Sequence, residues 1–559
     1  MQQYVSRSKR IIHSFFREGF AMKHLWYCVV ILVLWAASVF GQDLTVPTLK
    51  ASGKYLNEFI AADSAVAKTG TRTYILQRDS IYYVNAVIRN IGWTLRIKAG
   101  TKGYYKPTIF LSTPTGSAQN PEEMFNVNGD IYLQNILVGG YNELTPAFIS
   151  AINSALIWTA VENCTIAVDS CIFTNVGQAA IRTVSAPRVV KVTNCVFANM
   201  GYGGNYDPGN GRPIDLRNGS CDSLVVVNNT FVNNIDRVIR HYASTAAIKY
   251  FMFDHNTVIN NYAFHGMFAF GIMGDKGIIT NNLFVNPFTL GVDTDAVRQA
   301  EFIDSGEKDR FGQPRMTWIN SVPNTTTQWT IRNNYYTVST VEQNWYTRNT
   351  AAGVTGEGTP LTWHINSKIA DSVNAFKKVS VTLTNSPEIG TAFMDWYRSP
   401  TGANKTKVFS SWKMANDINR VSFVYLTDSL NCKYPTSASI YTAADGGKPV
   451  GALTWWNMAL TAVEKVGNQG VPETFTLNQN YPNPFNPSTT LQYTISKSSH
   501  VVLEVFNVLG QSVARLVDEP LATGTYKTTF NASSLSSGVY LYRLTAGDYV
   551  QTLKMVLMK

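Results

Sequence analysis

Charged residues recur in a series of short, similar segments in the middle of the chain. These segments are AAIRTV from Ala179, RPIDLRN from Arg212, RVIRHYA from Arg237 and HGMFAFG from His265. Each is compatible with a β-strand that buries one face, in which successive side chains point to opposite sides. The inward positions are then Ile181, Ile214, Ile239 and Met267. The outward row that follows them is Arg182, Asp215, Arg240 and Phe268, and a second outward row holds Val184, Arg217, Tyr242 and Phe270.

Such a surface is suited to anionic sugars, because the guanidinium group of arginine binds a carboxylate through two parallel hydrogen bonds. Cleaving a uronate chain by β-elimination needs positive charge on the carboxylate, a base and an acid. The candidate catalytic residues are Arg217, Arg240 and Tyr242, with Tyr242 as proton donor. The candidate substrate-binding residues are Arg182, Asp215 and Lys249. Lys249 and His241 are fallback bases, although strand alternation turns His241 inward.

Structural explanations compete with these assignments. The charged row is equally compatible with an ion-pair ladder that joins strands for little energy. An acidic group could bind Ca²⁺, the one candidate cofactor, or belong to a solvated loop. Its members are Asp293, Asp295, Glu301, Asp304, Glu307 and Asp309. The triplet Asp254–Asn256 resembles a lyase motif but falls within the structural repeat described next.

One sequence pattern recurs seven times and predicts the scaffold that positions these residues. Its copies are YLQNIL from Tyr132, VDSCIF from Val168, VTNCVF from Val192, VVNNTF from Val226, FDHNTV from Phe253, ITNNLF from Ile279 and IRNNYY from Ile331. One column aligns Asn135, Cys171, Cys195, Asn229, Asn256, Asn282 and Asn334, and an apolar residue follows two positions later. Several copies lie 24 to 27 residues apart, which suits one coil of a parallel β-helix. Asparagines at a tight bend would then bond to each other from coil to coil.

Over roughly residues 70–340, this pattern resembles the pectate-lyase-like superfamily of right-handed parallel β-helices. The resemblance implies an asparagine ladder at one bend of each coil and a substrate cleft floored by the first strand of each coil. The polygalacturonases of this fold carry Asn-Thr-Asp, Asp-Asp and Gly-His-Gly signatures, which this sequence lacks, so a hydrolase is disfavoured. The run YTAADGGKPVGALTWW from Tyr441 resembles β-helix proteins of polysaccharide-degrading bacteria.

The chain changes character from Phe475 onward. Prolines in NYPNPFNP, from Asn480, exclude a helix, and alternating segments separated by turns predict a small immunoglobulin-like β-sandwich. The motifs NYPNPFNP, GVYLYRL and the terminal KMVLMK resemble the type A sorting domain of the type IX secretion system. That resemblance implies export through the secretion machinery of a Bacteroidetes-type bacterium.

The N-terminal region predicts export as well. The apolar run Trp26–Phe40 follows basic residues and precedes small ones, which is typical of a signal peptide, and Met22 is a plausible true start. No later stretch predicts a membrane span. Residues 1–41 carry +4 of the formal net charge of +10, and the modest remainder favours an acidic polysaccharide over nucleic acid.

We therefore expect an all-β protein: a right-handed, pectin-lyase-like parallel β-helix followed by a sandwich. The predicted boundaries are a signal peptide at 1–41, the capped β-helix at 42–390, a cap or linker at 391–470 and the sorting domain at 471–559. The predicted protein is secreted or held at the outer-membrane surface. Its predicted function is action on uronate-containing glycans as a lyase, and the alternative is a non-catalytic glycan-binding or adhesin-like protein.

Overall fold

The computed structural model divides the chain into two units, Met1–Trp455 and Trp456–Lys559. The structure describes residues 43–66, 72–113, 121–140, 142, 155–201, 210–217, 219–241, 246–263, 267–287, 292–293, 317–319, 326–356, 375–398, 429–458, 464–465, 474–497, 499–521, 524–532 and 535–559. The signal-peptide prediction and Tyr242 lie outside the described residues.

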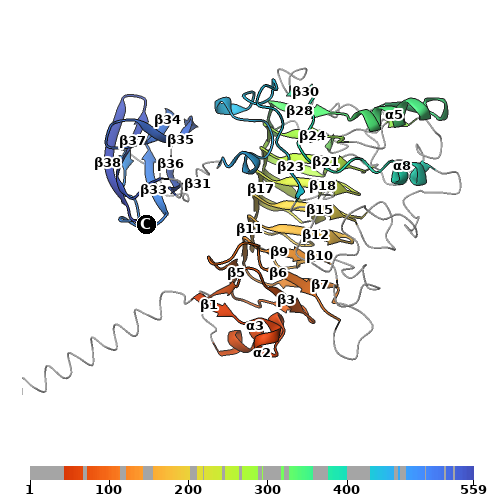
Figure 1. Ribbon diagram of the computed structural model, residues 1–559, viewed down its shortest axis with the longest axis horizontal. Coiled ribbons are helices and arrows are strands. Elements are labelled where there is room, and N and C mark those ends of the chain that lie inside the picture. The colour runs from red at the N-terminus through yellow and green to blue at the C-terminus, as the bar shows by residue number, and fades with distance from the viewer. Residues whose placement is uncertain are drawn as a thin grey trace, which may run out of the picture. The chain divides into compact units, whose positions relative to one another are not determined.

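The first unit is a parallel β-helix whose coils stack one above another (Figure 1). Sheet A contains β1 (Asp43–Val46), β2 (Thr73–Leu76), β5 (Leu95–Ala99), β8 (Ile131–Gln134), β11 (Thr165–Asp169), β14 (Val189–Thr193), β17 (Cys221–Val227), β20 (Ala247–Asp254), β23 (Ile272–Thr280) and β27 (Gln328–Arg332). Sheet B contains β3 (Ile81–Val84), β6 (Thr108–Leu111), β9 (Leu137–Gly139), β12 (Ile172–Val176), β15 (Val196–Met200), β18 (Thr230–Asn234), β21 (Thr257–Asn261), β24 (Leu283–Val285), β28 (Asn334–Thr337) and β30 (Phe376–Lys378). Sheet C contains β4 (Ile88–Arg89), β7 (Glu123–Val127), β10 (Ala155–Thr159), β13 (Ala179–Thr183), β16 (Arg212–Arg217), β19 (Ile239–His241), β22 (Phe268–Phe270) and β26 (Thr317–Ile319).

Short elements accompany the coils. The helices α2 (Leu49–Ser52) and α3 (Leu56–Val66) lie at the N-terminal end of the stack (Figure 1). Near its other end lie α5 (Thr340–Asn349), α8 (Thr391–Arg398) and the antiparallel pair β25 (Val292–Asp293) and β29 (Val354–Gly356). The described residues also form the 3₁₀ turns η2 (Thr350–Ala352), η3 (Asp445–Gly447) and η4 (Leu453–Trp456).

The interior of the β-helix is a continuous apolar core, because each strand turns alternate side chains inward. Phenylalanines stack along it from coil to coil. The ring centroids of Phe173 and Phe197 are 5.0 Å apart, and those of Phe197 and Phe231 are 5.1 Å apart. These spacings match the distance between neighbouring strands. The sequence therefore repeats because residues of the same type stack on one another in successive coils.

The predicted asparagine ladder runs along the bend between sheets A and B. The side-chain oxygen of Asn256 accepts from the backbone N–H of Asn229 at 2.9 Å, and Asn282 does the same for Asn256 at 2.8 Å. Cys195 N donates to Asn229 Oδ1 at 2.8 Å, and Asn282 Nδ2 donates to Asn334 Oδ1 at 2.8 Å. These contacts confirm the predicted all-β class and its parallel β-helix.

The alignment of the first repeat was wrong by one residue. Leu137 pairs with Ile172, so Asn135 corresponds to Ser170 rather than to Cys171. Asn135 and Ser170 both have left-handed backbone angles, with φ of 58° and 55°. The residue that bends the chain is therefore the one before the ladder residue, and Ile136 occupies the ladder position in the first repeat.

A second asparagine ladder follows sheet B, and the sequence interpretation missed it. Asn199, Asn233, Asn260 and Asn286 all have φ between 50° and 58°. Asn233 Nδ2 donates to Asn199 Oδ1 at 3.0 Å, and Asn286 Nδ2 donates to Asn260 Oδ1 at 2.8 Å. The signal was available, because each of these residues lies four positions after a member of the first ladder.

Residues 441–455, which we call the strap, lie along the outside of the A–B bend instead of extending the stack. Asn281 Nδ2 donates to Asp445 Oδ2 at 3.0 Å. The backbone N–H of Ala452 donates to Thr257 Oγ1 at 2.9 Å. Because these partners belong to different coils, the strap connects coils that are distant from it in sequence.

The second unit is a β-sandwich of two four-stranded antiparallel sheets around its own core. One sheet contains β31 (Glu464–Lys465), β36 (Gly524–Asn531), β33 (Ser488–Ile495) and β32 (Thr476–Leu477). The other contains β35 (Ser512–Leu521), β34 (Ser499–Phe506), β37 (Gly538–Ala546) and β38 (Tyr549–Leu557). Among the described residues of both units, no helix is long and apolar enough to cross a membrane.

Candidate functional site

The predicted charged row exists on the outward face of sheet C. Arg182 pairs with Asp215, and Asp215 pairs with Arg240, on three neighbouring strands. The inward residues Ile181, Ile214 and Ile239 also align as predicted. The fourth strand is shifted by one residue, because Ile239 pairs with Phe268 rather than with Met267. Ala269, and not Phe268, therefore follows Arg240 in the row.

The row is buried, although a solvent-exposed row was predicted. The exposed fractions of Arg182, Asp215 and Arg240 are 5%, 0% and 3%. Arg240 binds both oxygens of Asp215, through Nε at 2.7 Å and Nη2 at 2.6 Å. Arg182 Nε adds a third bond to Asp215 at 2.9 Å. One carboxylate thus fixes two guanidinium groups on strands either side of it.

A second set of charges continues this network toward the bend between sheets B and C. Arg212 donates from Nε to Asp236 Oδ2 at 2.6 Å, and its Nη1 lies 3.8 Å from Asp215 Oδ2. Arg237 Nη1 lies 3.2 Å from Asp236 Oδ2. We call the six residues the arginine cluster: Arg182, Arg212, Asp215, Asp236, Arg237 and Arg240. These six described residues contribute four guanidinium groups and two carboxylates, and each residue is at most 5% exposed.

The excess of positive charge controls the ionisation of Asp215. Burial alone would raise the pKa of this carboxyl, but Arg240, Arg212 and Arg182 lower it to about 2. Burial lowers the pKa values of Arg182 and Arg212 from their usual high range, and their acidic neighbours partly offset this effect. Asp215 is therefore a fixed anion at neutral pH and is unsuited to act as a base.

Arg217 lies at the exposed margin of the cluster, at the end of β16. Its backbone is left-handed, with φ of 42°, and the strand pairing shifts between Asp215 and Arg217. Because of this shift Arg217 pairs with His241, whereas Tyr242 was predicted as its neighbour. Strained non-glycine residues of this kind are concentrated at functional sites.

His241 is fully buried beside this margin, in agreement with its predicted inward direction. Its Nε2 lies 3.0 Å from the carbonyl oxygen of Gly219. Burial lowers its pKa to about 4. The imidazole is thus neutral at pH 7, with one nitrogen already occupied by a backbone contact.

The depressed pKa of His241 predicts acid sensitivity in a defined pH window. His241 takes up a proton near pH 6.5 in the unfolded chain but only near pH 4 in the folded chain. The free energy of unfolding therefore falls as the pH drops between these values. The full difference is about 3 kcal/mol. Urea unfolding at pH 7, 6, 5 and 4 measures it, and His241→Gln should flatten the profile in this window. An unchanged profile in that variant would show that other groups cause the effect.

The structure does not place the other two predicted residues, Lys249 and Tyr242, in the charged row of sheet C. Lys249 lies on sheet A, in β20, where its ammonium is 2.6 Å from Asp222 Oδ1. The hydrogen bond and charge of Asp222 raise its pKa, which makes Lys249 a poor base. Tyr242 lies outside the described residues. Of the six predicted site residues, Arg182, Asp215 and Arg240 lie together, with Arg217 at their edge.

Trp158 is a neighbour of the row that the sequence interpretation missed. It lies on β10, pairs with Arg182 and is half-buried. Its outward direction follows from Ile157, which lies in the core. An aromatic ring beside a guanidinium group is a surface on which a sugar ring can stack. The segment ALIWT could have been aligned with AAIRTV by the same alternation of residues.

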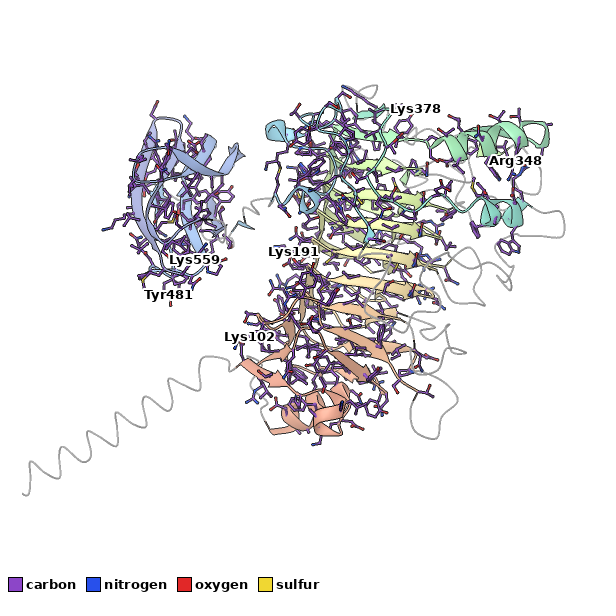
Figure 2. All side chains as sticks on the ribbon, viewed as in Figure 1. Lys102, Lys191, Arg348, Lys378, Tyr481 and Lys559 are labelled. Carbon is purple, nitrogen blue, oxygen red and sulfur yellow. The ribbon has the colours of Figure 1, made fainter. Side chains whose placement is uncertain are left out.

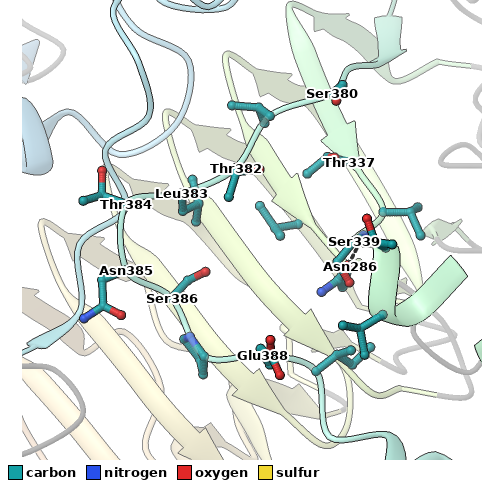
Figure 3. A pocket seen from close by; sticks show the side chains of 17 residues that line it. Asn286, Thr337, Ser339, Ser380, Thr382, Leu383, Thr384, Asn385, Ser386 and Glu388 are labelled. Carbon is teal, nitrogen blue, oxygen red and sulfur yellow. Dashed lines mark hydrogen bonds between the residues drawn. The ribbon is translucent and has the colours of Figure 1, made fainter. Parts of the chain in front are cut away.

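A separate groove of about 400 Å³ lies at the upper end of sheet B, between β28 and residues 380–389 (Figure 3). Hydroxyl and amide side chains line it, including those of Ser380, Thr382 and Asn385, together with the carboxylate of Glu388. None of the described residues that line it has a basic side chain, so this groove does not suit a polyanion.

The predicted Ca²⁺ site cannot be placed among the described residues. Of its six acidic residues only Asp293, in β25, falls within them. In the described parts of the chain no group of three His, Cys, Asp or Glu side chains could hold a metal ion. Within the triplet at 254–256, Asp254 accepts from Thr280 Oγ1 at 2.7 Å and Asn256 belongs to the first ladder.

Comparison with known proteins identifies the second unit. No curated protein and no solved structure matches the chain. Residues 479–558 match the family model described as "Secretion system C-terminal sorting domain", which covers the β-sandwich apart from its first strands. This match confirms the sorting domain that the motifs predicted. The chain is therefore a type IX secretion substrate, a β-helix protein exported to the cell surface or beyond the outer membrane.

Proposed function

We propose that this exported β-helix protein binds uronate-containing glycans over the outward face of sheet C. The observation that supports this proposal is the excess of arginine there: four guanidinium groups against two carboxylates among the described residues of the cluster. Such an excess within a low-dielectric environment projects positive potential onto the adjoining surface. The surface contacts that a glycan would meet are the exposed Arg217 and, beside Arg182, the half-buried Trp158.

Arg217 and Trp158 would have different roles in binding a glycan. Arg217 offers a guanidinium group that can bind a sugar carboxylate directly. Trp158 offers a flat apolar surface to the carbon face of a sugar ring. The buried cluster supplies charge next to these contacts, and Asp215 fixes Arg182 and Arg240 in single orientations.

Lyase activity is the second candidate, and the conformation of Arg217 favours it. An exposed arginine held at φ 42° beside a positive cluster is a strained, preorganised group. The resemblance to pectate-lyase-like proteins implies an arginine or lysine as base. In a β-elimination the base takes the proton next to the uronate carboxylate, and the glycosidic oxygen leaves with a proton from an acid.

Substitution of Arg217 and Trp158 tests the binding proposal. Arg217→Ala should weaken retention on polygalacturonate, alginate or chondroitin sulfate in affinity electrophoresis by about tenfold, as expected for one charge-assisted hydrogen bond. Trp158→Ala should weaken it by roughly fivefold through lost stacking. Lys276→Ala is the matched control, because it removes an exposed positive charge from sheet A. Equal retention of all variants would contradict the proposal that the outward face of sheet C binds the glycan.

A parallel assay separates binding from cleavage. A lyase leaves an unsaturated uronate whose absorbance rises with time on one member of the same panel. Retention without that absorbance supports the binding protein, and absorbance that Arg217→Ala abolishes supports the enzyme. If the protein shows no retention and produces no absorbance on any of the glycans, both functions are ruled out.

A further inference from the structure

The sorting domain presents two apolar side chains at the tip of one hairpin. Val508 and Leu509 lie between β34 and β35 and are 71% and 80% exposed. We call this pair the apolar tip. Both residues fall inside the segment that matches the sorting-domain family. Their exposure contrasts with the inner residues of the same strand, such as Val505, which is fully buried.

The hairpin holds this tip in one defined shape. Asn507 Oδ1 accepts from the backbone N–H groups of Leu509 and Gln511, both at 3.0 Å. Asn507 Nδ2 donates to Gln511 Oε1 at 2.8 Å. Gly510 adopts φ of 78°, which a residue with a side chain rarely does. The turn is thus determined by Asn507, Gln511 and Gly510, and none of these contacts needs an apolar side chain at 508 or 509.

The base of the hairpin is also fixed. The guanidinium carbon of Arg543, on β37, lies 4.3 Å from the centroid of the Phe506 ring. Phe506 ends β34, directly before the turn. The apolar tip is therefore a rigid projection from the sandwich. The hydrogen bonds of this turn come from Asn507 and Gln511, so the turn itself does not require valine and leucine at its tip.

We propose that the apolar tip is a docking element that inserts into an apolar pocket on a protein of the secretion machinery. The family match identifies this domain as the part of the chain that the machinery recognises. A rigid projection loses little conformational entropy on binding, and burial of two aliphatic side chains supplies affinity. This inference depends on the sorting domain and is independent of the proposed glycan binding.

Export of the full chain tests the proposal. In a host that has this secretion system, the double variant Val508→Ser/Leu509→Ser should reach the cell surface or medium at least about tenfold less than the parent chain, as for a binding hot spot. The missing protein should accumulate in the periplasm as full-length precursor. Immunoblots of periplasm, surface and medium measure this distribution.

Three controls make the result decisive. Val550→Ser changes another exposed aliphatic residue of the domain, 58% exposed, and should export normally. Tyr481, which is 81% exposed and labelled in Figure 2, lies in the NYPNPFNP motif and is left unchanged. The conservative variant Val508→Ile/Leu509→Met should also export. The melting temperature of the serine variant should equal that of the parent chain. Normal export of the serine variant would overturn the proposal, and so would a loss of export accompanied by a lowered melting temperature.

Discussion

Asp215→Ala will lower the free energy of unfolding of the β-helix by roughly 3–5 kcal/mol, because it leaves buried arginines without their shared carboxylate. Asp215 is fully buried and binds Arg182 and Arg240 through three hydrogen bonds of 2.6 to 2.9 Å. Without it, these guanidinium groups lose their partner in a region that water does not reach. Urea denaturation of the purified protein measures the change.

The matched control is another aspartate that pairs with a basic residue. Asp222 binds Lys249 at 2.6 Å, but its side chain is 51% exposed. Asp222→Ala should therefore cost about 0–1 kcal/mol. Equal losses in the two variants would show that the charged row is a weak surface ladder. The Asp215 contribution should also be pH dependent: it is complete above about pH 4 and is lost as pH falls toward 2, since the folded state depresses this pKa.

Asn256→Ala will have the second large effect, a loss of about 4 kcal/mol. Asn256 Oδ1 accepts from the backbone and side-chain amides of Asn229 at 2.9 and 3.0 Å. Its own amide donates to the carbonyl of Val226 at 2.9 Å and to Asn282 at 3.1 Å. Alanine leaves buried donors and acceptors unsatisfied at a position that is fully buried. Urea denaturation measures the loss.

The ladder also predicts a substitution that should be tolerated. Cys195 occupies the same column as Asn229, and Cys171 N donates to its sulfur at 3.4 Å. Cys195→Asn extends the asparagine ladder by one coil and should leave stability unchanged or raise it by about 1 kcal/mol. If Cys195→Asn were as damaging as Asn256→Ala, the column would tolerate no exchange and would not be a regular ladder.

The sequence predicts the coils well because stacking repeats the same residue types. Asn229, Asn256 and Asn282 share a position where the polar groups of a bend need identical partners above and below. In the first repeat the pattern is weaker, and the sequence alignment was wrong by one residue there. Asn135 was aligned with Cys171 because each has an apolar residue two positions later, yet the pairing of Leu137 with Ile172 shifts them by one position.

The candidate site was predicted only as far as strand alternation extends. Alternation places Arg182, Asp215 and Arg240 in one row, which the structure confirms. It says nothing about what covers them, so their burial was not foreseen. It also misses the shift of pairing before Arg217, because such an irregularity depends on local backbone contacts rather than on residue periodicity.

Burial gives the charged row a structural role, because its three members are at most 5% exposed and hydrogen-bond to each other. A network fixed by Asp215 cannot itself close around a ligand, so the proposal assigns the glycan contacts to Arg217 and Trp158 at its margin. Substitution at Asp215 should therefore reduce stability first, whereas substitution at Arg217 should reduce glycan retention alone. Comparing the two variants in both assays separates these roles.

The central claim is that the sheet C face recognises the carboxylate groups of a glycan. Affinity electrophoresis of the purified protein on polygalacturonate, beside the same polymer after methyl esterification, tests it most directly, since esterification removes the charge and keeps the sugar. The account predicts retention by the acidic polymer that disappears on esterification and weakens in Arg217→Ala. Equal retention by the two polymers, or retention by neither, would contradict it.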